Sequence, residues 1–249
     1  MNEYADFIKG KLDYLLSEMN DYLWMFVSNP RTDFTRKRKL NFIEMLRILL
    51  SMGGKSLKSE LLKYFSYDTE TVTCAAFVQQ REKILPEALE FLFGKFTSSA
   101  VKPNYHEGYR MLAVDGSDLC IPHNPKDTEN YFQTSPDAKG YNLMHLNAMY
   151  DLCSRIYVDA IAQPGRKENE FQALTDMVDR SDIKEKTIVI ADRGYESYNA
   201  FAHIEKKGWN YVIRIKDKNS NGILSGLSLP NQEIFDIEYS TLLTRRQTK

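Results

Sequence analysis

The chain contains few cysteines and lacks any long apolar run. Among its 249 residues there are three cysteines, an odd number without a C-x-x-C pair. Scattered, unpaired cysteines are typical of a reducing compartment rather than of a disulfide framework, so we expect a cytoplasmic protein. No stretch reaches the ~18 apolar residues of a membrane span, and the first ten residues carry Glu3, Asp6 and Lys9 where a signal peptide is apolar. Membrane and export functions are therefore not expected.

The chain also lacks an excess of either charge. Its 34 acidic and 33 basic residues nearly cancel, so the net charge predicts neither a polyanionic nor a polycationic partner. The distribution is uneven, however. Residues 29–83 contain eleven Lys or Arg against six Asp or Glu, a net of +5. With 43% hydrophobic residues, the chain is able to bury the core of one large or two modest domains.

Helical periodicity dominates the first hundred residues. Residues 4–27 place apolar side chains at helical spacing, and two further helices are expected on either side of the glycine pair at 53–54. Another helix is expected to begin near Thr71 or Thr73 and to bend at Pro86. This part of the chain is predicted to be all-α.

From residue 109 the periodicity changes to that of strands and helices. The expected order is β-β-β-α-β-α-β, with three antiparallel strands followed by parallel pairing through right-handed crossovers. The predicted strands are RMLAVDGS (110–117), NLMHLNAMYDL (142–152), RIYVDAIAQP (155–164), TIVIAD (187–192) and YVIRIKD (211–217). The fold class is therefore α/β, a mixed sheet preceded by an all-α region.

Two acidic residues stand directly after apolar strands. Asp115 follows MLAV, and Asp192 follows TIVIA. In open α/β sheets, ligands bind in the crevice beyond the carboxyl ends of the strands, so the two carboxylates converge if their strands are neighbours. Close carboxylates repel each other unless a cation lies between them, and their oxygens favour Mg²⁺ or Mn²⁺. The sequence thus predicts a metal site at this sheet edge.

Three segments carry a family resemblance. MLAVDGSDLCIP, YNLMHLNAMYDLCSRIYVDAIAQPGRKENE and TIVIADRGYESYNAFAHIEKKGWNYVIRIKD resemble the DDE transposases of bacterial insertion sequences, in the branch with a Y-x-x-R-x-x-x-E-x-x-x-x-x-x-K signature. RKRKLNFIEMLRILLSMGGKSLKSEL and CAAFVQQREKILPEALEFLF also resemble the helical amino-terminal region of this branch. The likeness therefore covers roughly residues 30–217, and it implies a ribonuclease-H-like catalytic core. By residue matching, Asp115 is the first acid and Asp192 the second, and Arg193 and Gly194 match the residues that commonly follow the second acid.

The third acid of the signature is not found. Tyr211 and Arg214 match Y-x-x-R by chance, and Lys218 stands where the signature requires glutamate. The segment from Gly222 resembles the start of a β-rich insertion, so we expect a copy truncated before the third acid. The expected domains are a helical DNA-binding region (1–105), an incomplete catalytic core (106–217) and the start of the insertion (218–249).

The resemblance implies metal-dependent DNA cleavage and strand transfer with Mg²⁺ or Mn²⁺. Double-stranded DNA, both transposon ends and target, is the implied partner, and a homodimer or synaptic complex is the implied assembly. Asp115 would hold both metal ions and Asp192 one, so without the third acid we expect DNA binding without efficient strand transfer. Two alternatives remain: a catalytically silent DNA-binding fragment that competes with an intact transposase, and a stand-alone nuclease with Glu170 or Glu196 as the substitute acid.

The basic segment precedes a helical pair. The run RKRK lies before two helices joined by a tight glycine corner, a geometry compatible with helix-turn-helix docking on DNA. The candidate DNA-binding residues are Arg36, Lys37, Arg38, Lys39, Lys55, Lys58 and Arg193.

Each candidate also has a structural explanation. Asp115 before Gly-Ser is typical of a turn, and Asp192 could be a solvated charge paired with Arg193. Glu170 opens an expected helix, whose positive end would stabilise it. His145 is expected to be a packed strand residue.

Overall fold

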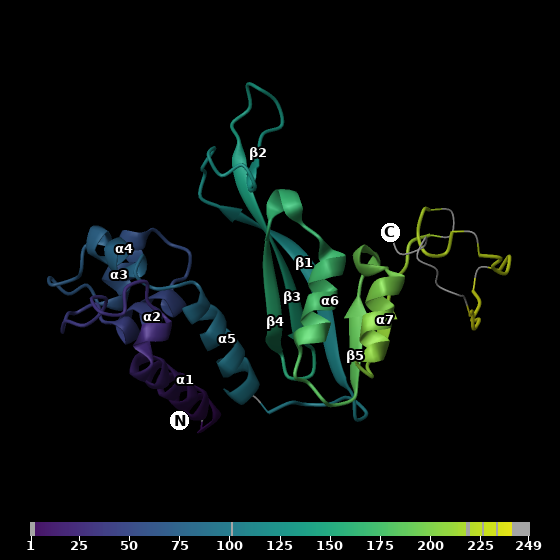
Figure 1. Cartoon of the computed structure of the whole chain (residues 1–249), viewed down its shortest axis with the longest axis horizontal. Helices are drawn as coiled ribbons and strands as arrows, with labels where there is room; N and C mark the ends of the chain where they lie inside the picture. The colour runs from purple at the N-terminus through teal and green to yellow at the C-terminus, as the bar shows by residue number, and fades with distance from the viewer. Residues whose placement is uncertain (1–2, 101, 218–219, 226, 233, 241–249) are drawn as a thin grey trace. The chain divides into compact units, whose positions relative to one another are not determined.

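The computed structural model describes residues 3–100, 102–217, 220–225, 227–232 and 234–240 (Figure 1). The chain divides into two compact units between residues 101 and 102. No helix in the described part of the chain is both long enough and apolar enough to cross a bilayer.

The first unit is all-α, as predicted. Three of its helices begin at a capping side chain that accepts the backbone N–H three residues later: Asn41 from Glu44, Ser56 from Ser59, and Thr73 from Ala76. Its elements are α1 (Glu3–Asp21), a 3-10 helix η1 (Leu23–Met25), α2 (Phe42–Ser51), α3 (Leu57–Tyr64), α4 (Cys74–Arg81) and α5 (Glu87–Ala100).

Helix α2 is central to this unit because it contributes to two hydrophobic clusters. Phe42 and Leu46 pack with residues of α1 and α5, whereas Met45 and Ile48 pack with residues of α3 and α4. All four side chains are almost completely buried. The two faces of one short helix thus hold the unit together.

The prediction of one helix bent at Pro86 is wrong. Two separate helices, α4 and α5, occupy this stretch, and the segment between them pairs with residues 26–28. Ser28 N donates to the Lys83 carbonyl, and Leu85 N donates to the Phe26 carbonyl. These tertiary hydrogen bonds compete with helix continuation, and local periodicity does not reveal them.

The second unit has the predicted mixed α/β organisation. Its sheet order is β2-β3-β1-β5-β6, with β4 on β3 as well. The elements are β1 (Arg110–Ile121), β2 (Tyr131–Phe132), β3 (Tyr141–Asp151), β4 (Ile156–Pro164), η2 (Gly165–Lys167), α6 (Glu170–Arg180), β5 (Thr187–Ala191), η3 (Arg193–Tyr195), α7 (Tyr198–Lys206) and β6 (Asn210–Ile213). The two-residue strand β2 was not predicted. The described residues beyond 217 form turns and irregular backbone without a strand, and Lys218 lies outside the described residues.

Strand β1 pairs differently on its two sides. It runs parallel to β5 from Arg110 to Val114, where the partner of Val114 is Ala191. On its other side it continues antiparallel to β3 as far as Ile121. Strand β1 is therefore longer than predicted, and its pairing with β5 ends at Val114. This fork positions the candidate site.

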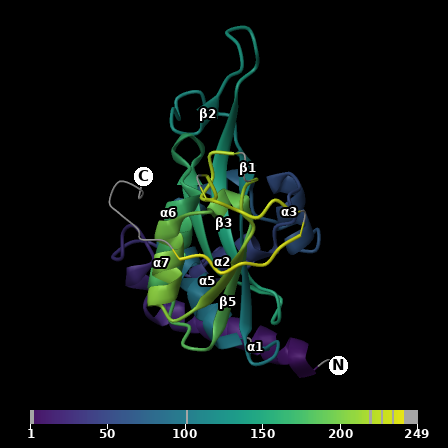
Figure 2. The same ribbon diagram turned by 90° about the vertical axis from the view of Figure 1, so that its right-hand side faces the viewer.

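Helices α6 and α7 lie side by side on one face of the sheet (Figures 1 and 2). Their apolar side chains and those of the strands form one core, in which Leu112, Val114, Met149 and Val189 face Leu174, Met177, Val178 and Ile204. The helix that carries Glu170 is thus anchored by its later turns, so its first turn has a defined place beside the sheet.

Asp151 organises the end of β3 as a fully buried charge. Its Oδ2 accepts a hydrogen bond from Arg110 Nε at 2.7 Å, and its Oδ1 accepts from the backbone N–H groups of Cys153 and Ser154. Ser154 Oγ donates to the same carboxylate. These bonds close the predicted turn between β3 and β4.

Replacing Asp151 by alanine should destabilise the protein by about 3–5 kcal/mol, because Arg110 and two backbone donors lose a buried partner. Chemical denaturation measures the change. Asp13→Ala is the matched control, since Asp13 pairs at the surface with Arg47 and both side chains are 44% exposed; its cost should stay below about 1 kcal/mol. Equal costs for the two variants would contradict this account.

Candidate active site

Asp115 and Asp192 each follow the last pair of the parallel register between β1 and β5. Both side chains are exposed and are oriented by a short hydrogen bond from their own loop. Gly116 N donates to Asp115 Oδ1 at 3.0 Å, and Gly194 N donates to Asp192 Oδ1 at 2.7 Å. The structure therefore places both acids where the parallel pairing of β1 and β5 ends, but only Asp192 follows the end of its strand; the expectation that Asp115 ends its strand is wrong, because β1 continues along β3 to Ile121.

Glu170, in the first turn of α6, adds a third carboxylate at this place. A Cβ atom placed on Gly194 would lie 2.8 Å from Glu170 Oε2 and 2.9 Å from Asp192 Oδ1, so both acids border Gly194. Burial raises the pKa of Glu170. His145 lowers it, and the charges of Asp192, Glu168 and Asp115 raise it further. The electrostatic neighbours of Glu170 thus include both predicted acids.

Tyr195 is fully buried beside these carboxylates. Its hydroxyl donates to Asn147 Oδ1 at 3.0 Å, and Asn147 in turn donates to Gln163 Oε1. Burial raises the pKa of Tyr195 far above its usual range, and the charges of Glu170, Asp115 and Asp192 add to this shift. Tyr195 therefore stays neutral and keeps the inner side of the site free of charge.

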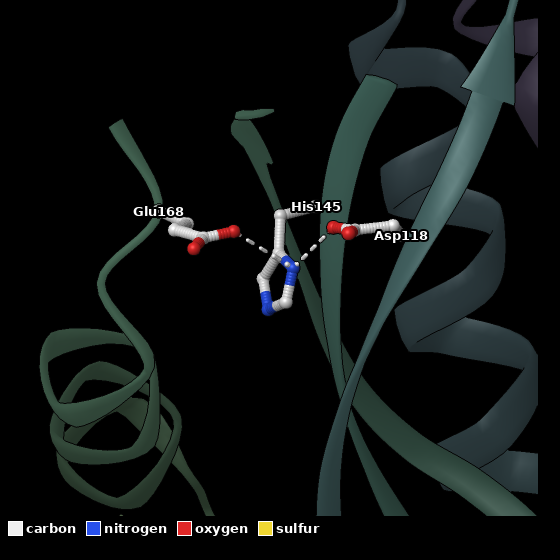
Figure 3. A group of neighbouring side chains, drawn as sticks. All are labelled: Asp118, His145 and Glu168. Atoms are coloured by element: carbon white, nitrogen blue, oxygen red, sulfur yellow. Dashed lines mark hydrogen bonds and ion pairs between the residues drawn. The ribbon is translucent and has the colours of Figure 1, made fainter. Parts of the chain in front are cut away.

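His145, on β3, is the remaining buried group of the site, with 6% of its surface exposed. Its Nδ1 lies 2.9 Å from Asp118 Oδ1 and 3.4 Å from Glu168 Oε2 (Figure 3). Its Nε2 has no hydrogen-bond partner among the described residues and lies 3.6 Å from Glu170 Oε1. The expectation of a packed strand residue holds for its burial, but it missed the three acids around the ring.

These residues suit a divalent cation. The charges of Asp192 and Asp115 raise the pKa of Glu170, so a cation near these acids would relieve their repulsion. Asp118, His145 and Glu168 form a second possible ligand group, with ligand atoms within 4.8 Å of one another. The residues at positions 116 and 194, which border the carboxylates, are both glycine. A Cβ atom at either position would lie closer than 3.0 Å to a carboxylate oxygen.

Glu196, the other substitute acid considered from the sequence, is engaged elsewhere. Its carboxylate is buried, accepts a hydrogen bond from Lys216 N at 2.8 Å and lies 3.3 Å from Lys216 Nζ. Its contacts are thus to the segment after β6. Arg193 lies in η3 directly after Asp192 and is exposed.

The other six predicted DNA-binding residues lie in the helical unit, and all are exposed. Residues 36–39 precede α2, Lys55 lies in the turn before α3, and Lys58 is in the first turn of α3. Lys39 already donates to the Glu70 carbonyl.

A hollow of about 410 Å³ adjoins the basic run. Four cationic residues, Arg31, Arg36, Arg38 and Lys83, line it together with one acid, Asp33. Asp33 is buried and accepts a hydrogen bond from Asn29 N. Lys83 was not predicted as a site residue, because it reaches the hollow from beyond α4 only through the tertiary fold.

A mixed sheet with carboxylates at the point where the parallel pairing of two adjacent strands ends is typical of a candidate phosphoryl-transfer enzyme. The model of the transposase DDE domain family matches residues 106–247, more than half of the chain. The chain therefore belongs to this family, and DNA is its substrate class. No curated protein matches the chain.

The raised pKa of Glu170 predicts a pH-dependent effect on stability without metal. The folded state holds the Glu170 proton more tightly than the unfolded state, so the protonated carboxyl stabilises the folded protein. This contribution is fully present below the unfolded pKa and is lost as the pH rises through the folded pKa. In EDTA, Glu170→Gln should therefore melt at a higher temperature than the wild type at pH 7.5 and at nearly the same temperature at pH 4.

Glu168→Gln is the matched control for this comparison, since the Glu168 side chain is 55% exposed. It should change the melting temperature little at either pH. A melting temperature of Glu170→Gln below that of the wild type at pH 7.5 would contradict the raised pKa assigned to Glu170.

Proposed function

We propose that this protein is the transposase of a bacterial insertion sequence and that it cleaves DNA and transfers the strand in a reaction that depends on Mg²⁺ or Mn²⁺. The observation that supports this proposal is the register of β1 and β5, whose parallel pairing ends at Val114 and Ala191, one residue before Asp115 and Asp192. Glu170 borders the same space, and the charges of Asp192 and Asp115 raise its pKa.

Each side chain of the site has a task that follows from its surroundings. Asp115 and Asp192 hold the divalent cation, and the backbone N–H groups of Gly116 and Gly194 orient their carboxylates. A bound divalent cation supplies Lewis-acid chemistry for phosphoryl transfer. Tyr195 closes the inner side of the site. Arg193 is exposed next to Asp192 and contacts a DNA phosphate.

The helical unit supplies DNA affinity. Arg36 and Arg38 line a hollow with a net positive charge, and Lys55 and Lys58 lie at the corner between α2 and α3. Such side chains bind phosphates irrespective of sequence and position the duplex. Two copies of the protein would join two transposon ends in a synaptic complex.

The acid pattern of the sequence supports a second candidate function. A Y-x-x-R-x-x-x-E match that would supply the third acid is not found among the 249 residues. In this alternative the protein binds transposon ends without strand transfer and competes with an active transposase. A cleavage measurement separates the two functions.

Purified protein should nick supercoiled DNA that carries the element's ends in the presence of Mg²⁺ or Mn²⁺. Asp115→Asn and Asp192→Asn should each lower the rate at least about 100-fold, because each removes a carboxylate that holds the cation, and every ~1.4 kcal/mol of transition-state stabilisation is tenfold in rate. Gel electrophoresis of the nicked product measures this rate.

The control for this assay is Asp182→Asn, which neutralises an exposed acid after α6 and should leave the rate unchanged. Wild-type nicking no faster than that of Asp115→Asn, with DNA binding intact, would reject cleavage and favour the silent DNA-binding function.

The double variant Arg36→Ala/Arg38→Ala should bind DNA more weakly at 150 mM salt. It should also make the negative slope of log affinity against log salt shallower by about 2, because two phosphate contacts are lost and roughly 0.9 counterions are released per contact. Fluorescence anisotropy over a salt series measures both quantities.

The matched control is Lys9→Ala/Lys11→Ala, which removes the same charge from α1. The salt slope of this control should equal that of the wild type. Equal slopes for both double variants would show that the basic run makes no phosphate contact.

A further inference from the structure

The sheet of the second unit has an open edge at β6. In the order β2-β3-β1-β5-β6, this strand pairs with β5 on one side and has no strand on its other side in the described part of the chain. Tyr211 and Ile213 pack against the core, whereas Val212 on the opposite face is 63% exposed. An open sheet edge with an exposed apolar residue is a template for a further strand.

The edge carries a positive charge that no acid pairs with. Arg214 follows β6, and its backbone N–H donates to the Ala191 carbonyl of β5. The Arg214 side chain is exposed and contacts no acid among the described residues. Lys216, by contrast, is tied to Glu196 through both its backbone N–H and its ammonium group. The edge that is open to pairing therefore spans residues 210–215, with Arg214 as its cation.

Residues 235–239 have the pattern of a strand but belong to no strand in this structure. Apolar and acidic side chains alternate along them, in the order Phe235, Asp236, Ile237, Glu238 and Tyr239. The three apolar side chains are 39%, 42% and 53% exposed. None of the five residues forms a hydrogen bond with another residue that the structure describes. A run of exposed apolar side chains commonly marks a surface that binds a partner.

The segment 235–239 and the β6 edge match each other in apolar character and in charge. In antiparallel pairing, which is the commoner and slightly more stable arrangement, residues directly opposite each other project from the same face of the sheet. With Ile237 opposite Ile213, Tyr239 would lie opposite Tyr211. In the same register, Asp236 would lie opposite Arg214. The apolar row of the segment would thus extend the face of β6 that packs against the core, and its first acid would meet the unpaired cation.

We propose that residues 235–239 of one copy of the protein add a strand to the β6 edge of a second copy, which returns the same pairing. Reciprocal exchange of an identical segment gives a closed dimer with twofold symmetry. Strand addition draws its affinity from backbone hydrogen bonds and its specificity from alternate side chains. The inference does not rest on the proposed function, because the pairing requires neither DNA nor a metal ion. It supplies an interface for the two copies of a synaptic complex.

The competing arrangement is the same strand within one chain. Tyr198 Oη donates to the Ile223 carbonyl, which holds the chain near the start of α7 and leaves the segment within reach of its own β6. The single chain does not adopt this pairing, since the apolar side chains of the segment remain exposed. Both arrangements make the same contacts, so an experiment that mixes two copies is needed to distinguish them.

Analytical ultracentrifugation of the whole chain over a concentration series tests the proposal. The wild-type protein should form a dimer. Arg214→Glu and Asp236→Arg should each weaken this dimer at least about 10-fold, because each variant places two like-charge pairs in the dimer. Lys184→Glu is the matched control, since it reverses an exposed charge between α6 and β5, and it should leave the dimer unchanged.

An equimolar mixture of Arg214→Glu and Asp236→Arg identifies the chain to which the strand belongs. In the mixed dimer, each edge meets a segment of opposite charge, so both pairs are attractive again. The mixture should therefore form a dimer with an affinity close to that of the wild type, although each variant alone stays monomeric at the same concentration. Mixing does not rescue pairing within one chain, because each chain keeps its own like-charge pair.

Hydrogen exchange provides a second measurement. The amides of residues 235–239 should be protected in the dimer and should lose this protection on dilution. Protection that is independent of concentration would place the strand within one chain and overturn the proposal. A wild type that is monomeric at every concentration, a dimer that both charge variants leave unchanged, or a mixture that does not recover would overturn it as well. Arg214 and Asp236 are both exposed, so neither variant should disturb folding, which circular dichroism checks.

Discussion

The parallel pairing of β1 with β5 is the constraint on which the rest of the site depends. It ends at Val114 and Ala191, while β1 continues along β3. Because one partner strand stops and the other does not, a fork opens at the residues that carry carboxylates. Buried side chains from both strands and from α6 hold this pairing in place. Rigid strand ends thus position charged groups that a mobile loop would not hold as well.

The concentration of negative charge at the fork has an energetic cost without a cation. Glu170 is partly desolvated beside two other acids, and its raised pKa reflects that cost. Tyr195 and Asn147 do not neutralise the charge, because both are neutral and pair with each other. The crowded carboxylates thus lower the stability of the folded protein in the absence of a cation. Such a cost is common where a protein arranges charges in advance to bind a ligand. Membership of the transposase DDE domain family is consistent with this arrangement.

The helical unit uses a different physical principle. Its core depends on the two buried faces of α2, and its basic side chains remain in solvent around a hollow and a helix corner. Phosphate recognition through solvated cations requires little preorganisation, so exposed Arg and Lys residues suffice. Each unit has its own hydrophobic core, and in the proposed function the helical unit would supply the affinity for DNA while the second unit would carry the chemistry.

Local patterns in the sequence determined much of this protein. Apolar periodicity predicted the all-α region, the order of the longer strands and helices of the second unit and the position of Asp192 after its strand, because these depend on neighbours within a few residues. It wrongly ended the first strand at Asp115, since the pairing of β1 with β3 continues to Ile121. Only the tertiary structure decided that Glu170 and His145 face the same space, since residues 145 and 170 come from different elements and Gly116 and Gly194 leave room for them. The break between α4 and α5 was likewise decided by hydrogen bonds to residues 26–28. Contacts between residues distant in sequence leave no periodic signal, so a polar cluster built from them becomes visible only when the chain is folded.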